Sequence, residues 1–125
     1  MLGSNPIDVI LLSTDMTGAS KTFYSDTLQL EVIQETEKTI VYRAGETRLK
    51  ISASTTGTKD SQTQASWRVD DVRAAVSWLR ERGVQPEEYD SDEVSTDDGV
   101  ADQGDAYVAW ITDPDGNVLG IEQPK

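Results

Sequence analysis

The chain has 125 residues, enough for one compact domain with a hydrophobic core. Its 23 acidic residues outnumber 11 lysines and arginines, and the formal net charge of −12 argues against binding to nucleic acid or anionic membranes. The absence of cysteine and histidine excludes disulfide bonds, zinc–thiolate sites, thiol nucleophiles and imidazole bases.

The first half of the chain predicts a strand, a helix and three further strands. An apolar run rich in β-branched residues predicts a strand at residues 7–13. Thr14 and Asp15 are good N-cap residues for a loosely periodic helix that reaches Leu28. Three short strands are predicted at residues 31–35, 39–44 and 48–53, and the polar stretch 54–63 reads as a linker.

The second half predicts the same order of elements. A strand at residues 65–69 is followed by Asp71, a good helix cap. The helix beyond it has clear amphipathic spacing and ends near Gly83. Its apolar positions are Val72, Ala75, Val76 and Leu79. Later strands are predicted at residues 85–89, 107–111 and 118–122.

An acidic stretch at residues 90–105 separates the predicted strands of this half. It has the carboxylate density of a calcium loop but lacks glycine at the sixth position and glutamate at the twelfth, counted from Asp90. It therefore predicts a mobile, solvated loop that can influence access to a neighbouring site.

Between the last two predicted strands stands the sequence Asp113-Pro114-Asp115-Gly116-Asn117. Pro114 presets one turn residue, while Gly116 and Asn117 tolerate positive φ. Apolar residues flank the segment on both sides, so it predicts the turn of a hairpin. Turn formation, rather than catalysis, explains its aspartates.

Three segments carry a resemblance to a known family. They are the capped first helix with Phe23, Tyr24 and Leu28, the segment 67–72 leading into the second helix, and the terminal turn. On these the chain resembles the vicinal oxygen chelate superfamily, which includes glyoxalases, bleomycin-resistance proteins and extradiol dioxygenases. The resemblance implies an α+β fold, with two βαβββ modules forming a curved eight-stranded mixed sheet around a central cleft. It places a single domain over residues 1–125, with modules at about 6–54 and 64–123 joined by a linker at 55–63, and implies a homodimer.

The resemblance also implies where metal ligands would stand. The two histidine positions are occupied by Asp8, seven residues before Asp15, and Gln64, seven residues before Asp71. The glutamate position, four residues after Gly116, is occupied by Gly120, which has no side chain to offer. We therefore expect no metal and no other cofactor. The alternative is an oxygen-only site for a divalent ion such as Mn²⁺, Mg²⁺ or Ni²⁺.

Strand alternation identifies further candidates for the cleft. Glu122 projects to the same side as Gly120, about 7 Å further along the strand. Arg68 shares a face with Gln64, whereas Trp67 points to the core, and Trp110 lies either in the cleft or in the core. The expected ligand-binding residues are therefore Asp8, Gln64, Arg68, Trp110, Gly120 and Glu122. Asp8 and Glu122 are also the candidate bases of a metal-free proton transfer.

The leading functional expectation is a metal-independent, cytoplasmic protein that binds or sequesters a small molecule, cationic or aromatic, without catalysis. No apolar run is long enough to span a membrane, and the N-terminus lacks the pattern of a cleaved secretory signal. One alternative is a lyase, isomerase or dioxygenase that uses an atypical oxygen-only metal site or a carboxylate base. Another is an interaction subunit without an open cleft.

Overall fold

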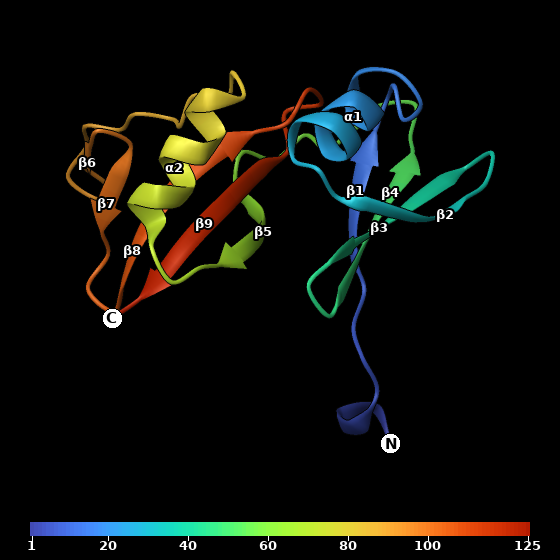
Figure 1. Cartoon of the computed structure of the whole chain (residues 1–125), viewed down its shortest axis with the longest axis horizontal. Helices are drawn as coiled ribbons and strands as arrows, with labels where there is room; N and C mark the ends of the chain where they lie inside the picture. Colours follow the sequence, from blue (N-terminus) through green and yellow to red (C-terminus); the bar gives the residue numbers. More distant parts are fainter. The chain divides into compact units, whose positions relative to one another are not determined.

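The computed structural model describes residues 1–125, which form two compact units. Unit 1 comprises Met1–Asp60 and Pro114–Asn117, and unit 2 comprises Ser61–Asp113 and Val118–Lys125. Each unit is built on one open sheet with few helices, so the predicted α+β class is confirmed. The strands are divided between a sheet of four and a sheet of five (Figure 1).

Unit 1 has the strand order β1-β4-β3-β2. Its strands are β1 (Val9–Ser13), β2 (Glu31–Glu35), β3 (Thr39–Ala44) and β4 (Thr47–Ala53). The edge strand β1 pairs in parallel with β4, and the other pairings are antiparallel. The predicted strands are confirmed, although β1 begins two residues later than the pattern suggested.

The first helix is shorter and less regular than predicted. Only α1 (Ala19–Lys21) is α-helical, and it continues as the π-helical segment η2 (Thr22–Thr27). The carboxylate of Asp15 accepts a hydrogen bond from the backbone N–H of Ala19 at 2.9 Å. Asp15 therefore satisfies one backbone donor at the helix start, but the N-cap residue is Gly18 and not Thr14 or Asp15 as predicted.

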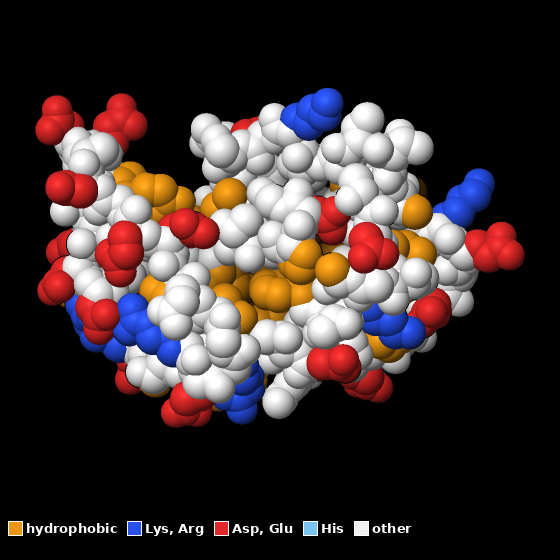
Figure 2. Space-filling view, turned by 90° about the horizontal axis from the view of Figure 1, so that it is seen from above, with side chains coloured by type: hydrophobic (Ala, Val, Ile, Leu, Met, Phe, Trp, Pro, Cys, Tyr) orange, Lys and Arg blue, Asp and Glu red, His pale blue; other side chains and the backbone are white.

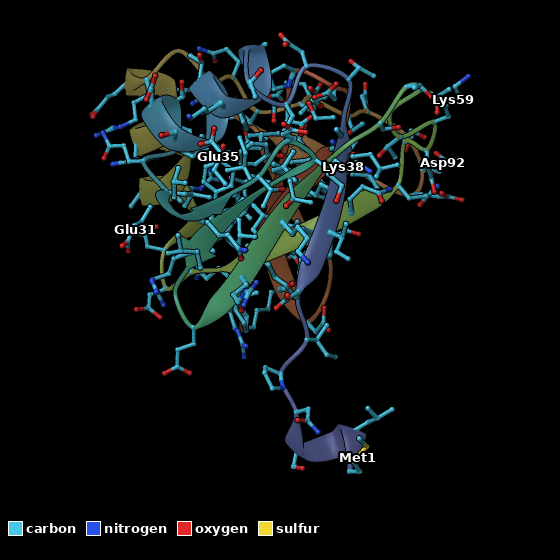
Figure 3. The ribbon with its side chains drawn as sticks, turned by 90° about the vertical axis from the view of Figure 1, so that its right-hand side faces the viewer. Met1, Glu31, Glu35, Lys38, Lys59 and Asp92 are labelled. Atoms are coloured by element: carbon cyan, nitrogen blue, oxygen red, sulfur yellow. The ribbon has the colours of Figure 1, made fainter.

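Before β1 the chain projects from the unit 1 sheet. Figure 3 shows Met1 at the far end of this segment, which includes the single-turn helix η1 (Leu2–Ser4). Leu2 and Ile7 are among its exposed apolar side chains. The core of unit 1 instead contains Tyr24 and Tyr42, which are fully buried with ring centroids 5.7 Å apart.

The turn between β8 and β9 packs within unit 1. One carboxylate oxygen of Asp115 accepts hydrogen bonds from the backbone N–H and the hydroxyl of Thr14, at 2.7 and 2.8 Å. The amide nitrogen of the fully buried Asn117 donates to the backbone oxygen of Leu12 at 2.9 Å. These polar side chains therefore shape the turn and also bind it to the end of β1.

Unit 2 has the strand order β5-β9-β8-β7-β6. Its strands are β5 (Thr63–Arg68), β6 (Thr96–Asp97), β7 (Val100–Asp102), β8 (Ala106–Thr112) and β9 (Val118–Pro124). The edge strand β5 pairs in parallel with β9, and the remaining pairs are antiparallel. The long β8–β9 hairpin, predicted from its turn sequence, forms the centre of this sheet.

The amphipathic helix α2 (Val72–Glu81) crosses one face of the unit 2 sheet (Figure 1). The carboxylate of Asp71 caps it by accepting a hydrogen bond from Ala74 N–H at 3.1 Å. Val76 and Leu79 are buried beneath it, which confirms the predicted apolar face. No helix of the chain is long and apolar enough to cross a membrane.

Two predictions for residues 85–105 were wrong in detail. Residues 85–89 do not form a strand, because Pro86 has no N–H to donate. This segment is bound to β8 by one backbone hydrogen bond, from Glu87 N–H to Trp110 O, and forms no continuous ladder with it. The predicted acidic loop contains β6 and β7, joined by Asp98 and Gly99 with φ of 52° and 83°. An Asp-Gly pair with both φ values positive is the signature of a tight type I′ hairpin turn.

Replacing Gly99 tests how far this turn depends on glycine. A Cβ at Gly99 would overlap the buried Pro86 ring, with Pro86 Cβ 2.8 Å away, in addition to straining the positive φ. Gly99→Ala is therefore expected to lower the free energy of unfolding by about 2 kcal/mol in urea titrations.

Gly83 provides a matched control, because its φ of 82° is close to the 83° of Gly99 and a Cβ added there would meet no atom within 4 Å. Gly83→Ala is expected to lower the free energy of unfolding by about 1 kcal/mol, because it adds only the backbone strain of the positive φ. Equal losses at the two positions would contradict the role assigned to the contact with Pro86.

Candidate functional site

The sheet of unit 2 has one covered face and one open face. Val72 N–H donates to the side-chain oxygen of Gln123 at 2.9 Å, so Gln123 points toward α2. Because side chains alternate along a strand, the neighbours Gly120 and Glu122 lie on the opposite, open face. By strand register the open face carries Ser66, Arg68, Val108, Trp110, Thr112, Val118, Gly120 and Glu122. Trp67 is paired with Ile121 on the covered face, as predicted.

Trp110 is the largest side chain on the open face. It lies directly opposite Gly120 in the β8–β9 ladder. Its indole N–H donates to the hydroxyl of Thr63 on β5 at 3.2 Å, so the ring reaches across β9. The sequence left Trp110 between cleft and core; the structure places it on the open face, with its polar atom satisfied and its ring half-buried.

Gly120 leaves room for this crossing. A Cβ built at Gly120 would lie 2.8 Å from Ser66 Oγ and 3.4 Å from Thr63 Cγ2. Any larger residue would therefore displace side chains of β5. Glycine at this position allows the indole to approach β5 closely, but it provides no side-chain atom that could bind a metal.

Gln64 does not take the place expected from simple alternation. The register shifts between Thr63 and Ala65, so Gln64 is the extra residue of a β-bulge. Its amide nitrogen donates to the backbone oxygen of Gln62 at 2.9 Å. Thr63, rather than Gln64, pairs with Val118 and meets Trp110. A bulge of one residue has no signature in this sequence, which explains why Thr63 was missed.

Arg68 and Glu122 face each other across the β5–β9 ladder. Arg68 is exposed and Glu122 is half-buried. Within unit 2 neither side chain forms an ion pair. Both charges thus stay available on the open face, beside Trp110 on the same side of the sheet.

Asp8 belongs to unit 1, just before β1. One of its carboxylate oxygens lies 3.6 Å from Nε of Arg48, and its side chain is 32% exposed. A carboxylate that serves as a general base near neutral pH requires apolar burial. Partial exposure beside a cation is the opposite environment, so the geometry gives no support to Asp8 as a base.

Two residues of the open face were missed as site residues from the sequence. Glu87 accepts a hydrogen bond from the Thr112 hydroxyl at 2.8 Å, which holds its carboxylate at the end of β8. The ring of Tyr89 meets that of Trp110 edge to face, with centroids 5.5 Å apart and planes at 85°. Burial, together with the negative charge of Glu87, raises the pKa of the Tyr89 phenol above its ordinary value of 10.0. The signal available in the sequence was the spacing of two between positions 87 and 89, which puts both side chains on the same side of the predicted strand.

Sequence comparison places the chain in a known family. The model of the Glyoxalase/Bleomycin resistance protein/Dioxygenase superfamily matches residues 6–121. The chain belongs to this superfamily. No curated protein matches it by sequence.

Solved structures of superfamily members share the fold. A glyoxalase/bleomycin resistance protein/dioxygenase from Alicyclobacillus acidocaldarius has a TM-score of 0.71 at 11% identity, covering 97% of this chain and 92% of that one. A bleomycin-binding protein complexed with bleomycin has a TM-score of 0.72 at 18% identity, covering 98% and 100%. A lactoylglutathione lyase from Agrobacterium tumefaciens has a TM-score of 0.65 at 18% identity, covering 96% and 93%. These similarities establish the fold.

The residues of this superfamily member do not fit a divalent metal at the expected positions. Within neither unit do three or more Asp or Glu side chains come together as a ligand group. Gly120 supplies no donor, Gln64 is engaged with its own backbone neighbour, and Asp8 is paired with Arg48. Stable sites for Mg²⁺ or Mn²⁺ need several oxygen ligands, and Zn²⁺ or Ni²⁺ prefer nitrogen or sulfur.

Proposed function

We propose that this superfamily member binds a small organic molecule on the open face of unit 2, without a metal ion and without catalysis. The observation that carries the proposal is the position of Trp110, whose indole crosses β9 over the side-chain-free position Gly120 and is fixed by Thr63. A rigid aromatic surface of this kind favours stacking and apolar contact with a flat ligand.

Polar groups around the indole would orient the ligand. Arg68 can bind a carboxylate or another anionic group, and Glu122 can accept hydrogen bonds. Gln64 is retained as a ligand contact of secondary importance, since its amide already donates to the backbone of Gln62. Asp8 belongs to unit 1 and is paired with Arg48, so it is not counted among the residues of this face. In this account affinity comes from Trp110 and selectivity from the charges beside it.

The bleomycin-binding neighbour supports a binding function by analogy, because fold alone does not determine activity. An enzyme of the lyase, isomerase or dioxygenase type would need a metal donor set or a buried carboxylate base, and the residue environments favour neither. By the resemblance we also propose a homodimer, which sedimentation velocity would test.

The experiment is a ligand screen followed by two-dimensional NMR of the tryptophan indole groups. Bleomycin free of metal, and a set of planar aromatic compounds, would first be tested by thermal shift. We expect at least one compound to raise the melting temperature and to move the Trp110 indole N–H resonance, which the variant Trp110→Phe would assign. Ligands that raise the melting temperature and move the other tryptophan indole N–H resonances, but not that of Trp110, would contradict the proposed site.

A further inference from the structure

Glu87, Tyr89 and Trp110 come together on the open face of unit 2, next to the end of β8. Glu87 and Tyr89 approach β8 through one backbone hydrogen bond, from Glu87 N–H to Trp110 O at 2.7 Å. The two rings meet at 85°, so they form a corner instead of a stack. Tyr89 remains 39% exposed, which leaves this corner accessible to solvent.

A negative charge is fixed beside the two rings. The Thr112 hydroxyl donates to Glu87 Oε1 at 2.8 Å, and Thr112 shares the open face with Trp110. Glu87 contacts Thr112 and Tyr89 contacts Trp110, and both partners belong to the open face of β8, so both side chains point to that face. Burial raises the pKa of the Tyr89 phenol, and the negative charge of Glu87 raises it further.

We propose that Glu87, Tyr89 and Trp110 form a subsite for an ammonium group carried by the small-molecule ligand. This inference rests in part on the proposed function, because it names the ligand class for the same face of unit 2. Aromatic faces attract cations through their quadrupole, and a neighbouring carboxylate supplies the opposite charge.

The charge of the protein agrees with a cationic ligand. Asp and Glu outnumber Lys and Arg over the chain, and Figure 2 shows acidic side chains scattered over the visible surface. Such a surface attracts cations at long range and repels anions. The one cation on the open face, Arg68, stands at the opposite end of β5 from Thr63, the residue that the Trp110 indole contacts.

The test compares choline with its neutral isostere 3,3-dimethylbutan-1-ol, and uses benzyl alcohol as a neutral aromatic probe. Binding is followed by the Trp110 indole N–H resonance. We expect choline to move this resonance in the millimolar range and the isostere not to move it. Glu87→Gln is expected to weaken choline binding at least about fivefold. Glu93→Gln, an equal change of charge on an exposed residue, is expected to leave it unchanged.

The other possible results distinguish failure of the ammonium subsite from failure of the proposed ligand-binding face. Equal shifts from choline and its isostere, or unchanged choline binding by Glu87→Gln in a variant that keeps the wild-type melting temperature, would overturn the ammonium subsite. A shift from benzyl alcohol but none from choline would overturn the subsite and leave the aromatic binding face standing. No shift from any probe would count against both.

Discussion

Asp115→Ala is expected to lower the free energy of unfolding by about 3 kcal/mol, measured by urea titration at pH 7. The substitution removes the acceptor of two hydrogen bonds, from the Thr14 N–H and from the Thr14 hydroxyl. Hydrogen bonds to a charged acceptor are among the stronger ones in proteins. Asp92→Ala, on an exposed residue, is expected to change stability by less than about 0.5 kcal/mol.

The same carboxylate predicts a dependence of stability on pH. Burial alone would raise the pKa of Asp115, but the hydrogen bonds from Ser13 and Thr14 outweigh it and hold the pKa below its ordinary value of 3.8. A depressed pKa in the folded state stabilises the protein above pH 3.8, and this contribution is lost as the pH falls through the lower, folded value. The stability difference between wild type and Asp115→Asn should therefore be constant from about pH 5 to 8 and shrink below about pH 4. A stability difference between the two proteins that stays constant below about pH 4 would contradict the lowered pKa of Asp115.

Trp110→Ala is expected to weaken binding of any ligand found in the screen by at least about tenfold, measured by isothermal titration calorimetry. The substitution removes the only aromatic ring that reaches across β9 on the open face, together with its contact to Tyr89. Tyr89 would lose the ring that orients it, so the effect should exceed the loss of direct contact area.

Two controls separate stacking from general damage. Trp110→Phe keeps an aromatic face but removes the N–H that binds Thr63, and is expected to weaken binding less than about threefold. Trp78→Ala removes a tryptophan of α2, which packs beneath Arg82 at 3.8 Å, and should leave ligand affinity unchanged. Equal weakening by the Trp78 and Trp110 variants would refute the specific role of the open face.

Most of the fold was predictable because strong local signals agreed with it. The Asp-Pro-Asp-Gly-Asn turn and the periodic spacing of α2 are both encoded over a few neighbouring residues, and both elements are found where predicted. Residues 85–89 show where such signals fail. They were predicted to form a strand, but Pro86 and one backbone hydrogen bond to β8 do not make a ladder. The Asp98-Gly99 turn was readable, yet acidic composition suggested a loop instead.

The candidate site was predictable only where regular alternation holds. It places Gly120 and Glu122 on one face correctly, because β9 is unbroken beside β8. It misplaces Gln64, because the bulge in β5 moves Thr63 into the position facing Trp110. Glu87 depends on a tertiary contact with Thr112 that no local pattern encodes. Non-local contacts of this kind explain why the ammonium subsite emerges only from the structure.

The most direct test of the central claim is metal analysis combined with ligand binding. Protein purified without added metal or chelator would be analysed by mass spectrometry for metals, before and after incubation with Mn²⁺, Ni²⁺, Zn²⁺ and Mg²⁺. Ligand affinity would then be measured with and without chelator. We predict substoichiometric metal under every condition and an affinity that chelator does not change. Near-stoichiometric metal that is lost in Asp8→Ala or Glu122→Ala, with ligand affinity lost alongside it, would contradict metal-independent binding.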